Sequence, residues 1–212
     1  MHPLKGNTHL ILHPTYFSPI VHYVALARAQ RVTFEVEDNY QKQTYRTRCY
    51  IYGANGKQLL NVPIQHNHSR KTKDIKIDFS FQWQKQHIKA MQIAYRSSPY
   101  FEFYEAEILA LFEKIPSFLL DFNLACQHTI LDLLQLEIPT TTTRAYQKEY
   151  TELCDARFLA DAKLKQEYHF EEYTQVFSNK LGFLENLSIL DLLFMEGPNA
   201  LNYLENQPLT IL

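Results

Sequence analysis

The sequence is poor in glycine and cysteine, and each shortage excludes a class of site. Only five glycines occur in 212 residues, so a glycine-rich loop that wraps a phosphate with backbone N–H groups is not expected. No P-loop, GxGxxG fingerprint or Ser-His-Asp nucleophile elbow is present. The three cysteines, Cys49, Cys126 and Cys154, lie far apart without CxxC or His-Cys spacing. We therefore expect a reducing compartment, with neither a disulfide framework nor a zinc site.

Long apolar runs and a large net charge are also missing. The run Leu10-Ile11-Leu12 is too short for the core of a signal peptide, and no stretch approaches the ~20 apolar residues of a membrane span. We therefore expect a soluble, cytoplasmic protein. The formal net charge of -2 excludes a chain that is basic throughout, and the 46% apolar content is ordinary for a globular protein. The length is within what one core can hold, so we expect residues 1–212 to form one domain.

The first half of the chain alternates strand and helix signals. Short apolar or alternating runs predict strands, and apolar residues at helical spacing predict one helix. The turn Gly53-Ala54-Asn55-Gly56 supplies the positive φ angles of a tight hairpin, and Pro63 places the second arm of that hairpin at a sheet edge. The predicted strands span 9–13, 31–37, 45–52, 58–65 and 74–79, and the predicted helix spans 20–30.

The second half has the period of helices. Trp83, His87, Met91 and Tyr95 fall on one helical face, Ser80 is the predicted cap, and Ser98-Pro99 ends the helix. Further helices are predicted at 103–114, 118–136 and 149–165, with a β-prone or loop segment at 140–143, and a last helix runs from a capping box of Ser188 and Asp191 to Gly197-Pro198. The fold class is mixed α/β (α+β). An N-terminal strand-helix-strand and a hairpin pack with a mostly helical C-terminal half.

The small net charge hides a basic segment between residues 40 and 76. Eight Lys and Arg residues there are opposed by Asp74 alone, whereas residues 101–172 are acidic. The basic residues are Lys42, Arg46, Arg48, Lys57, Arg70, Lys71, Lys73 and Lys76, with His66 and His68 beside them.

Strand alternation sorts the first arm of the hairpin into two faces. Residues two apart share a face, so Arg46, Arg48, Tyr50 and Tyr52 point one way. Guanidinium groups suit bidentate contact with phosphate or carboxylate, and tyrosines can stack on a ring or hydrogen-bond a sugar hydroxyl. The same pattern also fits an ordinary solvated face with tyrosines as strand formers, and both interpretations stay open.

Several blocks of sequence resemble the WbqC-like proteins of bacteria, in particular the branch found in Bacteroidetes. The resemblance covers most of the chain. The blocks are Pro14-Thr15-Tyr16 to Pro19 with Tyr23, residues 39–48 leading through 54–56 to 62–64, the set Trp83, His87, Tyr95, Pro99, Tyr100 and Phe101, and residues 187–194 followed by Gly197-Pro198.

The resemblance implies a role in surface-polysaccharide (O-antigen) or sugar-nucleotide metabolism. Transfer of an acyl or aminoacyl group to an amino sugar fits that setting, with a sugar nucleotide or an acyl or aminoacyl donor as partner. The chain departs from the family pattern at its start. The family often begins His-Gln-Pro-x-Tyr, but Leu12 stands two before Pro14 and His13 is out of that register. The Asn-Arg pair of the family hairpin reads Thr47-Arg48, so only the arginine carries over.

The best candidate cluster is Lys42, Tyr45, Arg46 and Arg48, because cationic groups can neutralise a phosphate and a tyrosine can orient a leaving group. Tyr45 and His87 are the catalytic candidates, although each fits a core position equally well or better. His66 and His68 lack a third ligand by spacing, so we expect no metal, and no cofactor is implied. The ligand-binding candidates are Tyr16, Tyr40, Lys42, Arg46, Arg48, Lys71 and Tyr95.

Three functions compete on this evidence. A transferase acting on a nucleotide-activated or amino sugar predicts a concave pocket under the hairpin. A single-stranded nucleic-acid module is motivated by the same basic strands, but the acidic helical half argues against it. A non-catalytic subunit that docks its hairpin on another chain predicts a flat surface with no pocket. The sequence leaves the oligomeric state open.

Overall fold

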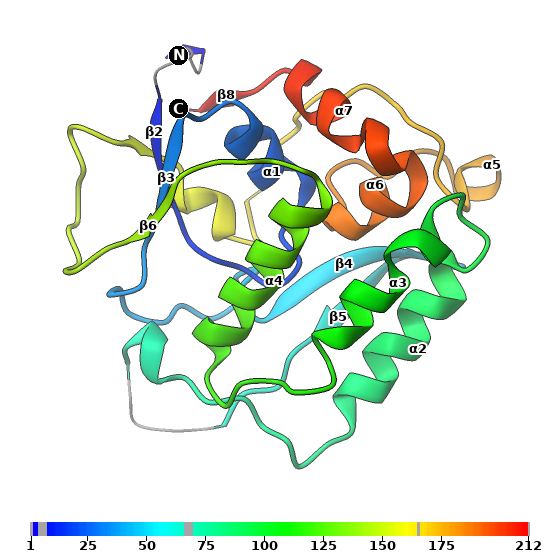
Figure 1. Ribbon diagram of the computed structural model, residues 1–212, viewed down its shortest axis with the longest axis horizontal. Coiled ribbons are helices and arrows are strands. Elements are labelled where there is room, and N and C mark those ends of the chain that lie inside the picture. The colour runs from blue at the N-terminus through cyan, green and yellow to red at the C-terminus, as the bar shows by residue number, and fades with distance from the viewer. Residues whose placement is uncertain (1, 4–7, 66–69, 165, 212) are drawn as a thin grey trace.

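The central sheet consists of four parallel strands. The computed structural model describes residues 2–3, 8–65, 70–164 and 166–211, and most of its helices and strands are labelled in Figure 1. The strand order is β6-β3-β2-β7. The four strands are β2 (His9–Leu12), β3 (Arg31–Phe34), β6 (Thr140–Thr142) and β7 (Cys154–Asp155).

The winding of this sheet reverses beside its first strand. From β2 the chain moves to β3 and then to β6 on one side, whereas β7 adds to the opposite side of β2. The register is parallel throughout, with Leu10 opposite Val32 on one side and opposite Cys154 on the other. In open parallel sheets, ligands bind outside the carboxyl ends of the strands at such a reversal. The carboxyl ends of β2 and β7 are therefore the first place to search for a site.

Helix α1 (Ile20–Ala27) connects β2 to β3 and is almost entirely buried. All its residues from Ile20 to Leu26 are buried, because α6 (Ile189–Glu196) and α7 (Ala200–Asn206) pack against it. A helix that is apolar on every side must be covered in this way. The ends of the chain also meet, since β1 (His2–Pro3) pairs antiparallel with β8 (Thr210–Ile211) (Figure 1).

The predicted hairpin is confirmed as a separate two-stranded sheet. Strand β4 (Arg48–Gly53) pairs antiparallel with β5 (Gly56–Asn61), and the turn needs the positive φ of 104° at Gly56. Helix α2 (Trp83–Tyr95) packs on β4, and the Tyr95 hydroxyl accepts a hydrogen bond of 3.1 Å from the backbone N–H of Tyr52.

The remaining helices lie mainly in the second half, so the predicted mixed α/β class is confirmed. They are α3 (Phe101–Ala110), α4 (Leu119–Leu133) and the short α5 (Ser178–Leu181), with 3₁₀ turns η1 (Thr72–Asp74), η2 (Arg157–Ala160) and η3 (Gly197–Asn199). Among the described residues, the core joins apolar side chains from the parallel sheet, the hairpin and every helix longer than one turn.

Two predicted elements are wrong. Residues 74–79 form no strand, because η1 ends at Asp74 and the segment then makes only isolated bridges, from Ile77 to Ile64 and from Lys76 to Phe118. Of the helix predicted at 149–165, the described residues 149–164 form no α-helix. The segment instead holds β7 and η2, because pairing with the buried strand β2 overrides its local helical pattern.

Two predicted caps are also wrong in detail. Helix α2 begins after Gln82 without a side-chain cap, and the backbone N–H of Ser80 donates to Asp78 instead. Ser188 does cap α6 by accepting from the N–H of Leu190, and Gly197 ends that helix as predicted. Asp191 does not complete a capping box, because it points into the core and accepts from the Tyr95 and Tyr173 hydroxyls at 2.9 and 2.6 Å.

Candidate functional site

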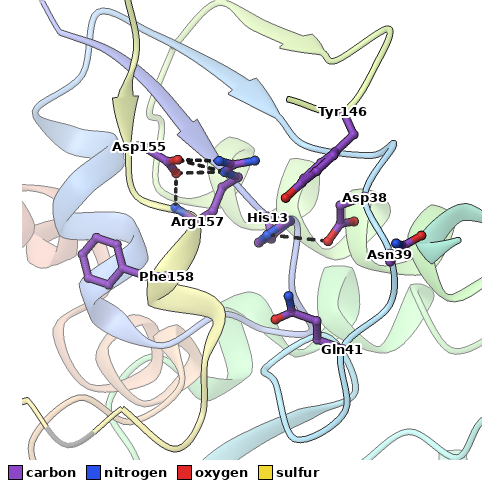
Figure 2. Close-up of a pocket in the computed structure, with 8 residues that line it drawn as sticks. All are labelled: His13, Asp38, Asn39, Gln41, Tyr146, Asp155, Arg157 and Phe158. Atoms are coloured by element: carbon purple, nitrogen blue, oxygen red, sulfur yellow. Dashed lines mark hydrogen bonds and ion pairs between the residues drawn. The ribbon is translucent and has the colours of Figure 1, made fainter. Parts of the chain in front are cut away.

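A polar pocket of about 470 Å³ lies at the carboxyl edge of the parallel sheet. Its residues come from the ends of all four strands. His13 follows β2, Asp155 ends β7, Asp38 lies in the segment after β3, and Tyr146 lies in the segment after β6. The pocket therefore occupies the edge at which the winding of the sheet reverses. Figure 2 shows the lining residues His13, Asp38, Asn39, Gln41, Tyr146, Asp155, Arg157 and Phe158.

His13 presents a neutral imidazole to this pocket. Its Nε2 lies 3.8 Å from the Asp38 carboxylate (Figure 2), and its Nδ1 is buried. Burial lowers the pKa of His13 well below its usual value, and the positive charge of Arg46 lowers it further. The ring is therefore unprotonated at neutral pH, and the same causes make it a weak base.

Asp38 is a carboxylate held in one orientation. One of its oxygens accepts from the Arg46 guanidinium at 2.6 Å, and the other accepts from the Thr72 hydroxyl at 2.7 Å. Burial raises the pKa of Asp38, whereas Arg46 and the Thr72 hydrogen bond oppose that rise. Arg46 is itself only 1% exposed, and its Nε and Nη1 have no partner in the described part of the chain. Asp38 is thus fixed beside His13, with Arg46 balancing its charge.

Arg157 forms the wall at the β7 side. Its Nε donates to Asp155 at 2.9 and 3.1 Å and its Nη2 donates to the same carboxylate at 2.5 Å. Its Nη1 lies 3.5 Å from Glu35, a carboxylate that is completely buried. The hydrogen bonds with Asp155 and the charge of Asp155 raise the pKa of Arg157. This arginine is occupied by protein carboxylates, so it shapes the wall and is not a free phosphate receptor.

The same groups hold the segment that carries Tyr146. Arg157 donates to the carbonyl oxygens of residues 147 and 148, both at 2.9 Å, and its guanidinium lies 5.6 Å from the centre of the Tyr146 ring. Glu35 accepts from the Thr143 hydroxyl at 2.8 Å and from the Tyr150 hydroxyl at 3.1 Å. Tyr146 is therefore held at the rim of the pocket with its ring half exposed.

The predicted site residues are not gathered in this pocket. Arg46 comes nearest, because it lies behind the wall against Asp38. Tyr16, His87 and Tyr95 are buried in the core, where the Tyr16 hydroxyl is 2.9 Å from Nδ1 of His87. Lys42 and Lys71 are exposed, and Lys71 donates to the backbone of Glu37. Tyr40 and Arg48 are partly buried, and neither lines the pocket.

Tyr45 lines a second cavity, of about 270 Å³, beside the hairpin. Burial raises the pKa of Tyr45 to about 12, so its hydroxyl stays protonated at neutral pH. Of the two catalytic candidates, Tyr45 therefore faces a cavity, whereas His87 packs against Trp83 in the core.

Sequence reasoning set His13 aside as out of the family register, and it missed Asp38, Asp155 and Arg157. One usable signal was the position of His13 directly after a buried apolar strand and before a proline. The others were hidden, because they depend on which strands pair. In the described ranges, no group of three His, Cys, Asp or Glu residues could hold a metal ion. His66 and His68 lie outside the described residues.

The fold and the pocket define a class of protein, an α/β protein with a polar pocket at the carboxyl edge of a parallel sheet. The chain belongs to the WbqC-like protein family, whose model matches residues 14–163. No curated protein and no solved structure matches the chain. Within the residues that the structure describes, none of the helices has the length and apolarity needed to cross a membrane.

Proposed function

We propose that this protein is a transferase that moves an acyl or aminoacyl group onto an amino sugar or nucleotide sugar during surface-polysaccharide synthesis. The observation that carries the proposal is the neutral His13 beside the fixed carboxylate of Asp38, in a polar pocket at the reversal of the sheet. Membership of the WbqC-like family supports the sugar setting, because the family takes its name from an O-antigen gene cluster.

His13 acts as the proton acceptor in this mechanism. The amine of the acceptor attacks the carbonyl carbon of the acyl group, and His13 takes the proton that the amine loses. The bond from the carbonyl carbon to the leaving group then breaks, the leaving group keeps the electron pair, and His13 returns the proton to it. Asp38, 3.8 Å away, stabilises the imidazolium that forms between these steps.

The other lining residues supply recognition. Tyr146 and Phe158 offer aromatic rings to a planar or sugar ring, and the amides of Asn39 and Gln41 can pair with hydroxyl or base atoms. The position of the pocket is where parallel sheets bind nucleotides. The three free cysteines fit a reducing compartment, so we place the protein in the cytoplasm.

The test is thermal unfolding against a panel of nucleotide sugars, amino sugars, acyl-CoA compounds and ATP. A ligand that binds the native state must raise its stability. We expect one nucleotide sugar or acyl donor to raise the melting temperature of the wild type, and Asn39→Ala or Gln41→Ala to abolish the shift, since both residues are exposed and their loss should not affect folding.

His13→Gln separates chemistry from binding. With the ligand pair found in the panel, this variant should keep the thermal shift but lose product formation by about 10²–10⁴-fold, the usual contribution of an acid–base group. His128→Gln, an exposed histidine on α4, is the matched control and should behave as wild type. Full turnover in His13→Gln, or a thermal shift that survives both amide substitutions, would contradict the proposal.

A further inference from the structure

The cavity that Tyr45 lines is separate from the polar pocket. The two share no lining residue. Its walls come from the hairpin through Tyr50 and Lys57, from the segment after η2 through Asp161, and from Tyr168 and residues 185–186. Nothing in the proposed reaction uses this cavity, so the groups around it require their own explanation.

Three tyrosines give the cavity an aromatic lining. Tyr45 and Tyr50 meet edge to face with their ring centres 6.2 Å apart, and Tyr168 stacks on Phe170 at 5.3 Å. All three lining tyrosines are partly buried. In the described part of the chain, none of their hydroxyls has a hydrogen-bond partner. The rings are therefore fixed by packing, while their hydroxyls remain available to a ligand.

Charged and amide groups complete the lining. The Lys57 ammonium lies 4.5 Å from the centre of the Tyr50 ring, and within the described residues it forms no ion pair. Glu185 is held by the N–H groups of Tyr168 and Phe170, at 3.1 and 2.8 Å. Asn186 accepts from the N–H of Val21 through Oδ1, which leaves its amino group as a donor. The lining thus offers both donors and acceptors beside the aromatic rings.

We propose that this cavity binds one monosaccharide unit that carries no negative charge. At about 270 Å³ it is smaller than the usual ~300–1,000 Å³ of sites for drug-sized ligands, so a single ring is the fitting size. A sugar ring has C–H faces that pack on tyrosines, and hydroxyls that can both donate and accept.

The charged residues that line the cavity indicate which sugars it can bind. Two carboxylates, Asp161 and Glu185, stand against the single ammonium of Lys57, so an anionic sugar is disfavoured by like-charge repulsion. The inference goes beyond the proposed function and does not depend on it. The unit could be a free monosaccharide or the terminal residue of a longer glycan, since both present the same ring.

Ligand-observed NMR with the full chain tests this assignment. The probes are glucose, N-acetylglucosamine, a disaccharide of each, and glucuronate. We expect saturable binding of at least one neutral sugar and weaker binding of glucuronate. Stronger binding of the disaccharide than of its monosaccharide would assign the site to a glycan end, and equal binding would assign it to the free sugar. No saturable binding by any neutral probe would overturn the proposal.

Substitutions in the lining test whether the sugar binds in this cavity. Tyr168→Ala and Lys57→Met should each weaken the neutral sugar by about tenfold, the scale of one aromatic contact or one charged hydrogen bond. Lys57 is exposed on β5, so its replacement leaves the core intact. Phe103→Ala, at an exposed aromatic residue of α3 outside both cavities, is the matched control and should bind like wild type. Binding lost in Tyr146→Ala and kept in Tyr168→Ala would place the sugar in the polar pocket, overturning this inference while supporting the proposed function.

Discussion

At the residue scale, Arg46 and Asp38 form a buried ion pair, in which each charge is stabilised by the other. The two groups are 2.6 Å apart, and each is almost completely buried. Removing one partner of a buried pair strands the other charge and costs about 3–5 kcal/mol. We expect Arg46→Met to lower the free energy of unfolding by an amount in that range at pH 7, measured by urea unfolding, while Arg48→Met, at a partly buried position with no ion pair in the described chain, lowers it less.

This deficit should shrink in acid. Burial raises the pKa of Asp38 and Arg46 opposes the rise, so without Arg46 the folded variant holds a proton at a pH at which the unfolded chain has released it. The stability of the variant then falls as the pH rises above 3.8. Arg46 also lowers the pKa of His13. Without Arg46 this pKa rises, so protonation of His13 in acid costs the variant less stability than it costs the wild type, and the deficit shrinks further. An equal deficit at pH 5 and pH 7 would show that no titrating partner of Arg46 is buried there.

The same residues show what could be predicted from the sequence. The charge count found Arg46, but strand alternation placed it on the open face of the hairpin. Strand β4 begins only at Arg48, and the preceding backbone includes Gln43 at a φ of 62°, so alternation does not extend back to Arg46. Asp38, the partner of Arg46, is close to it in the sequence but precedes the basic segment, which begins at residue 40. Asp155 and Arg157 enter the site only through the pairing of β7 with β2, which no local pattern encodes.

At the scale of elements, the spacing of apolar residues predicted helices and strands correctly where only one face of the element is buried. Helix α2 and the hairpin were found because their apolar spacing is set by a single interface. The segment around β7 was missed because two paired residues carry too little pattern to compete with a helical spacing. Asp191 on α6 was misassigned for a related reason. The spacing from Ser188 matched a capping box, whereas its true partners, Tyr95 and Tyr173, come from distant segments.

Helices α1 and α2 each bury a histidine that makes stability depend on pH. Burial lowers the pKa of His22 and of His87 to about 4. Between pH 6.5 and 4 the unfolded chain binds protons at these positions and the folded chain does not, so stability falls as the pH falls. The loss at pH 5 is about 2 kcal/mol for each group, and it is absent above pH 7.

His87→Gln tests this linkage. The variant keeps a polar group near Tyr16 but no longer titrates, so the fall in unfolding free energy between pH 7 and pH 5 should be smaller by about 2 kcal/mol than in the wild type. Urea unfolding at several pH values measures it. The exposed His128→Gln serves as the control and should leave the slope unchanged. The linkage fails if His87→Gln and the wild type lose equal stability over this range.

At the scale of the whole molecule, the structure balances the charge of the basic segment. Acidic residues just before the segment, absent from the count that began at residue 40, provide the partners. Asp38 pairs with Arg46, and Glu37 pairs with Lys73 at 2.8 Å. The core shared by the sheet, the hairpin and the helices leads us to infer that residues 1–212 form one domain. The hairpin therefore packs into the common core, and its cationic side chains lie in different environments.

This arrangement leads to a prediction about nucleic acid. A protein that tracks a single strand needs a continuous row of free cations, and its affinity then falls steeply with salt as phosphate contacts release counterions. Arg46 is buried, Lys73 is paired, and Lys57 lies over Tyr50 beside the second cavity. We therefore expect single-stranded oligothymidine to give at most a small thermal shift at about 50 mM salt and none at about 200 mM. A large shift at about 50 mM salt that Lys57→Met and Lys73→Met remove in steps would instead make the basic segment a nucleic-acid surface.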